Sequence, residues 1–192
     1  MLIVVRHGRT PANAEGRLLG RLDPDLDEVG VEQARAVAEW IGPVDRVITS
    51  PLARARQTAA AFAVEAEVDE RWIELDYGEL DGRLVGEITP AVWERLRDDA
   101  DWTPEGGESL RDLHSRVVLA CEELVAIAAD LDVVVVTHVS PIKSVLAWTL
   151  GGATGVPGVP LRTRVGQPSI TKVGFGPAGP VLHGFNLAPP VG

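Results

Sequence analysis

Two arginines and two histidines stand at positions where anion-binding side chains are common. Arg6 and His7 directly follow an apolar run at 2–5, Arg54 lies just beyond a second apolar run, and His138 ends a row of valines. Arginine forms planar, paired hydrogen bonds with phosphate oxygens, and a neutral imidazole can act as a nucleophile. If these four side chains meet, they could bind a phosphoryl group and attack its phosphorus atom.

The elements that must position these residues follow from the hydrophobic pattern. Continuous β-branched runs predict buried strands, and apolar residues at helical spacing predict amphipathic helices. Gly42-Pro43 ends the first of these helices, and Ser50-Pro51 and Ser140-Pro141 are predicted to begin later ones, with serine as cap and proline in the first turn. The predicted strands are 2–5, 45–50, 132–138, 169–175 and 180–185, and the predicted helices are 28–41, 50–63, 89–98, 109–129 and 140–150.

Strands that alternate with helices predict a three-layer α/β/α sandwich with a mainly parallel central sheet. No internal repeat or linker is visible, so residues 1–192 are expected to form a single domain. Ligands bind at the carboxyl ends of parallel strands, where helix starts also offer free N–H groups to an anion. This places the candidate residues at the functional edge of the predicted sheet.

Composition narrows the class of partner. The formal net charge of −10 argues against nucleic acid and against an anionic membrane surface, so a local cluster of cations must capture any bound anion. No apolar run reaches the length of a signal peptide's core or of a membrane span, and the single cysteine, Cys121, lies in a helical pattern typical of burial. We therefore expect a cytoplasmic protein. The sequence leaves open whether it forms a homodimer.

Five segments, in order, resemble the motifs of the histidine phosphatase (phosphoglycerate mutase-like) superfamily. They cover residues 2 to about 150, and five ordered motifs are a far more specific signal than the RHG triplet alone. The segments are RHG at 6–8 with Thr10 and Asn13, SPLARARQTA around Arg54, ELDYGELDG from Glu74 to Gly82, PEGGES at 104–109, and VVVVTH ending in His138.

The resemblance implies a phosphoglycerate mutase-like fold and a reaction through a phosphohistidine. In this mechanism His7 attacks phosphorus, while Arg6, Arg54 and a protonated His138 bind the phosphoryl oxygens. Glu74, kept protonated by the nearby anion, donates a proton to the leaving oxygen and later activates water. The implied partner is a small phosphorylated substrate, with no cofactor and no metal, and no metal-ligand cluster is evident in the sequence.

Other polar residues are weaker candidates. Asn13 is expected to contact phosphate, and Gln57 either orders Arg54 or is a solvated helix residue. Asp76 and Asp81 either favour the protonated form of Glu74 or are ordinary exposed acids.

Further side chains are assigned ordinary roles where nothing more is required. His114 and His183 are expected to have surface or packing roles, and Lys143 is expected to be an exposed helix residue in preference to one that contacts a distal anion of the substrate. Trp93 and Trp102 either pack between helices or form the roof of the pocket. The remaining arginines either face water or bind a second anionic group, and they are Arg17, Arg21, Arg83, Arg162 and Arg164.

Within the superfamily, the sequence favours a phosphatase over a mutase. Leu75 and Val85 stand where the resembling mutases carry cations that hold the substrate carboxylate, and an arginine-bearing insertion has no room between Gly82 and Pro104. Val139 replaces a glycine common after the second histidine, which predicts a different turn there because valine disfavours positive φ. Two alternatives stay open: mutase-type phosphoryl transfer and a non-catalytic phosphate-binding module.

Overall fold

The computed structural model describes residues 1–151 and 162–189, and within them one six-stranded sheet runs through the molecule. The order across the sheet is β3-β2-β4-β1-β5-β6. Its strands are β1 (Leu2–Arg6), β2 (Arg46–Thr49), β3 (Ala66–Val68), β4 (Val133–Thr137), β5 (Ser169–Gly176) and β6 (Gly179–Leu187).

Four neighbouring strands are parallel, and their carboxyl ends lie at one edge. Strand β4 pairs in parallel with both β1 and β2, and β2 pairs in parallel with β3. Arg6 lies opposite Thr137, and Thr49 lies opposite Val136. The next residue of each strand is therefore at the same edge, which brings His7, Ser50 and His138 together. Strands β5 and β6 extend the sheet in antiparallel fashion beside β1.

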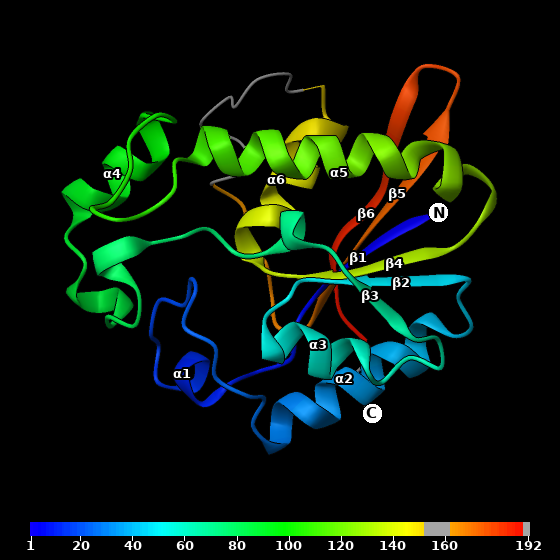
Figure 1. The fold of residues 1–192 in the computed structure, drawn as a ribbon, viewed down its shortest axis with the longest axis horizontal. Coiled ribbons are helices and arrows are strands. Elements are labelled where there is room, and N and C mark those ends of the chain that lie inside the picture. Colours follow the sequence, from blue (N-terminus) through cyan, green and yellow to red (C-terminus); the bar gives the residue numbers. More distant parts are fainter. Residues whose placement is uncertain (152–161, 190–192) are drawn as a thin grey trace.

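Helices cover both faces of the sheet, which confirms the predicted three-layer sandwich. Helices α5 and α6 lie on one face and α2 and α3 on the other, while α4 lies beyond the end of the sheet (Figure 1). The helices are α1 (Pro11–Ala14), α2 (Glu28–Ile41), α3 (Ala53–Ala59), α4 (Pro90–Asp98), α5 (Leu110–Asp130) and α6 (Val139–Thr149), with short 3₁₀ turns at η1 (Glu70–Trp72), η2 (Gly78–Leu80) and η3 (Val85–Glu87).

The valines of β4 divide the core into two halves. Val133 and Val135 pack into the cluster beneath α5 and α6, whereas Val134 and Val136 pack into the cluster beneath α2 and α3. All four side chains are fully buried, because a central parallel strand is covered on both faces. The sheet edge that carries the candidate residues is therefore anchored from both sides.

Two predicted helix starts are wrong. Helix α3 begins at Ala53, and Leu52 rather than Ser50 occupies its cap position. Helix α6 begins at Val139, so Ser140 lies inside its first turn and His138 is the cap. In both places the serine hydroxyl contacts a residue distant in sequence, Ser50 with His138 and Ser140 with Tyr77.

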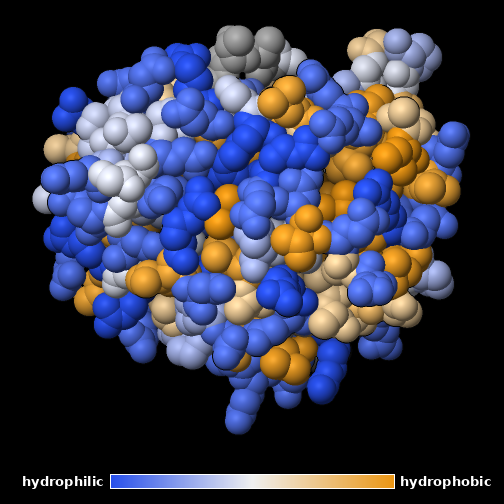
Figure 2. All heavy atoms as spheres, in the orientation of Figure 1, coloured by the Kyte–Doolittle hydropathy of each residue, from blue (hydrophilic) through white to orange (hydrophobic). Residues whose placement is uncertain are grey.

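The surface is polar in character. Hydrophilic residues cover most of the face drawn in Figure 2, with apolar residues interspersed mainly toward the right of the view. Within residues 1–151 and 162–189, no helix is long and apolar enough to cross a bilayer.

Candidate active site

His7 follows β1 directly and is held as a neutral imidazole. Its backbone N–H donates to the Thr137 carbonyl at 3.0 Å, which continues the β1–β4 pairing by one residue. Ring atom Nδ1 lies 2.7 Å from the carbonyl oxygen of Gly8. Since a carbonyl only accepts, Nδ1 carries the proton and Nε2 keeps a free lone pair. Burial, then the nearby Arg54 and Arg6, hold the pKa of His7 well below its ordinary value.

His138 faces His7 from the end of β4. The two ring centroids are 5.0 Å apart, and Nε2 of His138 lies 2.7 Å from the hydroxyl oxygen of Ser50. Nδ1 is buried and has no hydrogen-bond partner among the described residues, so this atom is the one that can meet a ligand. Burial, Arg54 and His7 hold the pKa of His138 well below its ordinary value. Within the protein alone the neutral form is favoured, whereas the sequence analysis expects a protonated His138 beside a bound anion.

Two cations complete the cluster, the partly buried Arg6 and the fully buried Arg54. Arg54 is fully buried, and its two terminal nitrogens donate to the Leu22 and Gly20 carbonyls at 2.6 and 2.8 Å. Arg6 donates to the Val165 carbonyl at 2.9 Å. Burial lowers the pKa of Arg6 to about 10 and also lowers that of Arg54. The Nε–H of each arginine is buried without a hydrogen-bond partner in the described part of the chain, an arrangement that a bound oxyanion would satisfy.

Gln57 does not touch Arg54, so the expected direct ordering is wrong. Its side-chain oxygen accepts the N–H of Leu26 at 2.8 Å, and its amide nitrogen donates to Asp25 at 2.7 Å. Gln57 and Arg54 hold the same loop, residues 20–26, from two positions of helix α3.

Asp81 holds that loop from the opposite side. Its carboxylate accepts three backbone N–H groups, those of Gly20, Arg21 and Leu22, at 2.7–2.8 Å. Asp76 accepts the N–H of Gly78 at 2.9 Å. Both acids, considered in the sequence as neighbours that act on Glu74, therefore bind backbone.

Glu74 lies in the loop between η1 and η2, and its side chain contacts the first residues of helix α6. One carboxylate oxygen accepts the N–H groups of Leu75 and Ser140 at 2.7 and 3.1 Å, and the other accepts the N–H of Val139 at 3.0 Å. The side chain is 3% exposed. Val139 is helical and uses its N–H to bind Glu74, so glycine's positive φ is not needed at this position.

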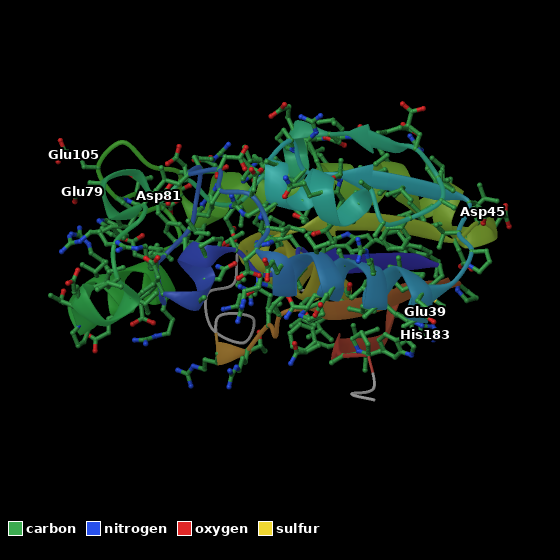
Figure 3. The ribbon with its side chains drawn as sticks, turned by 90° about the horizontal axis from the view of Figure 1, so that it is seen from below. Glu39, Asp45, Glu79, Asp81, Glu105 and His183 are labelled. Atoms are coloured by element: carbon green, nitrogen blue, oxygen red, sulfur yellow. The ribbon has the colours of Figure 1, made fainter. Side chains whose placement is uncertain are left out.

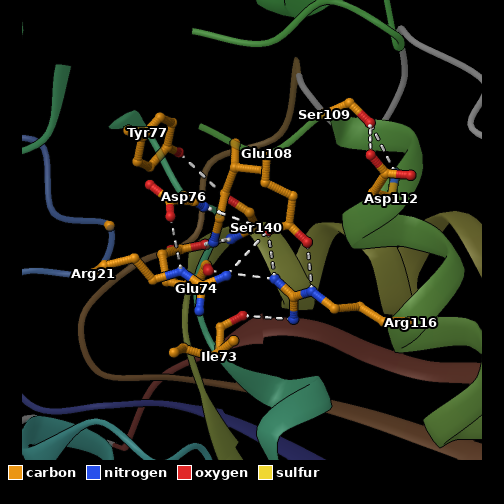
Figure 4. A network of polar contacts seen from close by, with 12 residues as sticks. Arg21, Ile73, Glu74, Asp76, Tyr77, Glu108, Ser109, Asp112, Arg116 and Ser140 are labelled. Atoms are coloured by element: carbon orange, nitrogen blue, oxygen red, sulfur yellow. Dashed lines mark hydrogen bonds and ion pairs between the residues drawn. The ribbon is translucent and has the colours of Figure 1, made fainter. Parts of the chain in front are cut away.

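A salt bridge between Arg116 and Glu108 supports the backbone at Glu74. Arg116 of α5 donates to the carbonyls of Ile73 and Glu74 at 2.8 and 3.3 Å, and it pairs with both carboxylate oxygens of Glu108 at 2.7 and 2.9 Å (Figure 4). Arg21 approaches the same carboxylate at 3.4 Å. The sequence analysis singled out the segment around Glu108 but missed Arg116, whose place in a helical pattern shows no signal of this role.

Asn13 and Gln167 support the loop that carries His7. The Asn13 side-chain oxygen accepts from the N–H of Thr10 at 3.2 Å and from the Gln167 amide at 2.9 Å, which leaves the Asn13 amide nitrogen as the group that could donate to an anion. Gln167 also donates to the Gly8 carbonyl at 3.0 Å. The sequence analysis missed Gln167, because nothing in the Gly- and Pro-rich tail indicates which loop it will contact.

The remaining histidines and the cysteine lie outside the cluster. His114 is buried with Nδ1 2.7 Å from the Ser144 hydroxyl, and Cys121 is buried in α5. His183 is exposed on β6, at the opposite end of the molecule from Asp81 (Figure 3). Lys143, expected to be an exposed helix residue, is half-buried and lines a cavity, so that expectation is wrong.

The cluster can bind and attack a phosphoryl group. Its parts are an imidazole with a free lone pair, one partly buried and one fully buried guanidinium group, a second imidazole whose Nδ1 has no partner among the described residues, and the carboxyl group of Glu74. Among residues 1–151 and 162–189, no group of three or more His, Cys, Asp or Glu side chains is arranged as a metal site.

Comparison with known proteins finds the same architecture and related sequences. A solved mycobacterial glucosyl-3-phosphoglycerate phosphatase in complex with VO3 superimposes with a TM-score of 0.86 and 32% identity, covering 97% of this chain and 98% of the other. A 2,3-bisphosphoglycerate-dependent phosphoglycerate mutase of Sinorhizobium fredii is 34% identical over 192 residues, 90% of this chain and 89% of the mutase.

A bifunctional protein of Mycobacterium tuberculosis is 35% identical over 165 residues, 81% of this chain. The chain spans less than half the length of that relative, 45%. The family model for the histidine phosphatase superfamily (branch 1) matches residues 2–188. With this match over nearly its whole length, the chain belongs to the histidine phosphatase superfamily.

Proposed function

We propose that the protein is a phosphomonoesterase that hydrolyses a small phosphorylated metabolite through a phosphohistidine at His7. The observation that carries the proposal is the state of His7. Its Nδ1–H is tied to the Gly8 carbonyl, and its free Nε2 faces a buried cluster of Arg6, Arg54 and His138. A neutral imidazole among buried cations is arranged to attack a bound phosphate dianion.

The reaction proceeds in two displacements. First, the Nε2 lone pair of His7 forms a bond to phosphorus, the ester P–O bond breaks, and Glu74 gives its proton to the leaving alcohol oxygen. Then Glu74 takes a proton from water, the water oxygen attacks phosphorus, and the P–N bond breaks to release phosphate and neutral His7. Arg6, Arg54 and His138 hold the equatorial oxygens in both steps. The guanidinium groups supply the positive charge, so we expect no metal requirement.

Leu75 supports hydrolysis over mutase-type transfer. It is buried and apolar at the position where the resembling mutases carry an arginine, so it cannot hold a substrate carboxylate there. The mutase relative keeps the alternative testable: interconversion of 2- and 3-phosphoglycerate without phosphate release would favour it.

The proposal is tested with p-nitrophenyl phosphate in the presence of EDTA. We expect turnover that persists with EDTA, is abolished in His7→Ala and is unchanged in His183→Ala, since His183 is an exposed residue of the edge strand β6. Phosphate or vanadate binding without turnover over a broad panel of phosphomonoesters would instead identify a non-catalytic binding module.

A trapping experiment tests the intermediate. Rapid quenching during turnover of a ³²P-labelled substrate should capture label on the protein that is stable in base and labile in acid, as expected for a phosphorus–nitrogen bond. The label should be absent from His7→Ala. Acid-stable label, or label retained by that variant, would contradict a phosphohistidine at His7.

A further inference from the structure

A cavity of about 200 Å³ opens beside Glu74. Leu75, Val139 and Ser140 form one wall of the cavity, and these are the three residues whose backbone N–H groups hold the Glu74 carboxylate. The cavity is therefore adjacent to the group that must reach the leaving oxygen. The alcohol part of the substrate, which is attached to the leaving oxygen, can therefore extend into this cavity.

The other walls are mostly apolar. Trp93 and Leu96 of α4 and Leu110 of α5 line the cavity, together with the buried ring of Tyr77. A dry cavity of about 150 Å³ holds one benzene molecule, so a volume of this size accommodates a single ring with a small substituent. Such walls favour a leaving group with an apolar body over a sugar-like polyol.

One cation in the cavity forms no ion pair in the described part of the chain, although the Glu74 carboxylate lies close enough to act on it. Lys143 lies one turn after Val139 on α6, is half-buried, and forms no hydrogen bond or ion pair with any residue of the described ranges. Long helical side chains lean toward the N-terminus of their helix, which directs Lys143 toward the Glu74 end of the cavity. Burial lowers the pKa of Lys143, while Glu74 opposes this change. A cation kept in this position without a partner suits a ligand that carries the missing negative charge.

Resting on the proposed phosphatase function, we propose that this cavity binds the alcohol part of the substrate, and that this part is an apolar, ring-sized body with an anionic group, such as a carboxylate, that pairs with Lys143. The second cation at the cavity, Arg97, already pairs with Asp98 at 2.9 Å, so it is not a free partner for the anionic group.

The experiment compares two substrates of the same shape that differ by one charge, 3-carboxyphenyl phosphate and 3-carbamoylphenyl phosphate. The wild-type kcat/KM should be higher for the carboxylate, and Lys143→Met should lower the carboxylate-to-amide ratio at least about tenfold. Lys143→Arg, which keeps the cation, should retain most of the preference. Lys172→Met, on β5 beside Trp40, serves as the matched control and should leave the ratio unchanged.

Three results with these two substrates would overturn the proposal. The first is a wild-type preference for the amide, and the second is an unchanged ratio in Lys143→Met. The third is an equal loss on both substrates accompanied by weaker vanadate inhibition, because this pattern would assign Lys143 to the transferred phosphoryl group. Turnover of other phosphomonoesters but of no aryl phosphate would overturn the subsite alone. If the wild type turns over no phosphomonoester of a broad panel, the proposed phosphatase function itself fails, and the subsite fails with it.

Discussion

At the scale of single residues, Arg54 supports the proposal that the site binds an anion. A guanidinium with no exposed surface is unusual, because removing a charge from water is costly unless it is paired. Its terminal nitrogens donate to two loop carbonyls, and one of them lies 3.7 Å from a carboxylate oxygen of Asp23, yet its Nε–H has no partner among the described residues. A phosphoryl oxygen is a natural acceptor for that group.

Ser50, which does not cap α3, contacts the His138 ring instead. Ser50→Ala removes the 2.7 Å contact with His138 Nε2, so we expect kcat/KM on p-nitrophenyl phosphate to fall roughly tenfold because the ring loses the partner that fixes its orientation. Ser144→Ala is the matched control, since it removes a 2.7 Å contact with His114. Steady-state kinetics of both variants distinguish the two sites. Equal losses in the two variants would contradict a positioning role for Ser50.

Arg116 is expected to act through Glu74 and not through substrate. In Arg116→Met the Ile73 and Glu74 carbonyls lose their hydrogen-bond donor, so the Glu74 carboxyl group is positioned less well to donate a proton to the leaving oxygen. The loss in kcat/KM should be about tenfold greater for phenyl phosphate than for 2,4-dinitrophenyl phosphate, whose leaving group needs no proton. Arg111 lies on the same helix as Arg116 and forms an exposed ion pair with Asp101, which precedes that helix. Arg111→Met should therefore affect the turnover of both substrates little. A uniform loss on both substrates would indicate a merely structural role for Arg116.

At the scale of elements, the start of α2 packs against the loop that carries His7, the proposed nucleophile. Gly8 and Gly30 approach so closely that a Cβ on either would overlap the backbone of the other segment, Gly8 against the Gly30 carbonyl and Gly30 against Arg9. The conformation of the His7 loop is thus fixed by packing against helix α2 as well as by the hydrogen bond to β4.

Gly30→Ala should therefore destabilise the fold by roughly 1–3 kcal/mol and also lower activity, since the strain is relieved only by moving the loop. Gly86→Ala, where the added methyl group meets no atom within 4 Å, is the control and should change neither property. Urea denaturation and kinetics on the same preparations provide both readouts. Retained stability in Gly30→Ala would show that α2 and the loop separate easily.

At the scale of the whole molecule, the two buried histidines make stability depend on pH. Both have pKa values well below the ordinary histidine value, so the unfolded chain takes up protons that the folded chain does not. The free energy of unfolding should fall as pH drops below about 6.5, by up to about 1.4 kcal/mol per pH unit for each histidine.

Urea denaturation between about pH 7.5 and pH 5.5 measures this dependence. The double variant His7→Gln/His138→Gln should lose most of it. Carboxylates with lowered pKa, such as Asp69, lose their contribution only at much lower pH, so they do not enter this window. A double variant with the same slope as the wild type would contradict this explanation.

Much of the architecture could be predicted because buried parallel strands have an unmistakable sequence pattern. The valines before His138 and the apolar run before Arg6 marked central strands, and polar residues at their ends marked the edge where ligands bind. Helix α2 was predicted at its observed bounds, since its apolar spacing is regular and Gly42 ends it.

What could not be predicted depends on contacts between distant segments. The pattern Ser-Pro predicts a helix start in isolation, but at Ser50 the tertiary contact with His138 takes the hydroxyl. Strand β3 is three residues long and mostly exposed, so it carries no periodic signal. The burial of Lys143 depends on α4 lying across the end of the sheet, which nothing in the local sequence around α6 reveals.

The partner of Arg6 has a consequence for biosynthesis. The carbonyl that orients this guanidinium belongs to Val165, 159 residues further along the chain, and Gln167 supports the neighbouring loop in the same way. On the ribosome, the proposed nucleophile His7 therefore emerges long before the segment that completes its surroundings. A nascent or prematurely terminated polypeptide that lacks this segment should be inert toward phosphate esters, so catalysis begins only once translation has passed it.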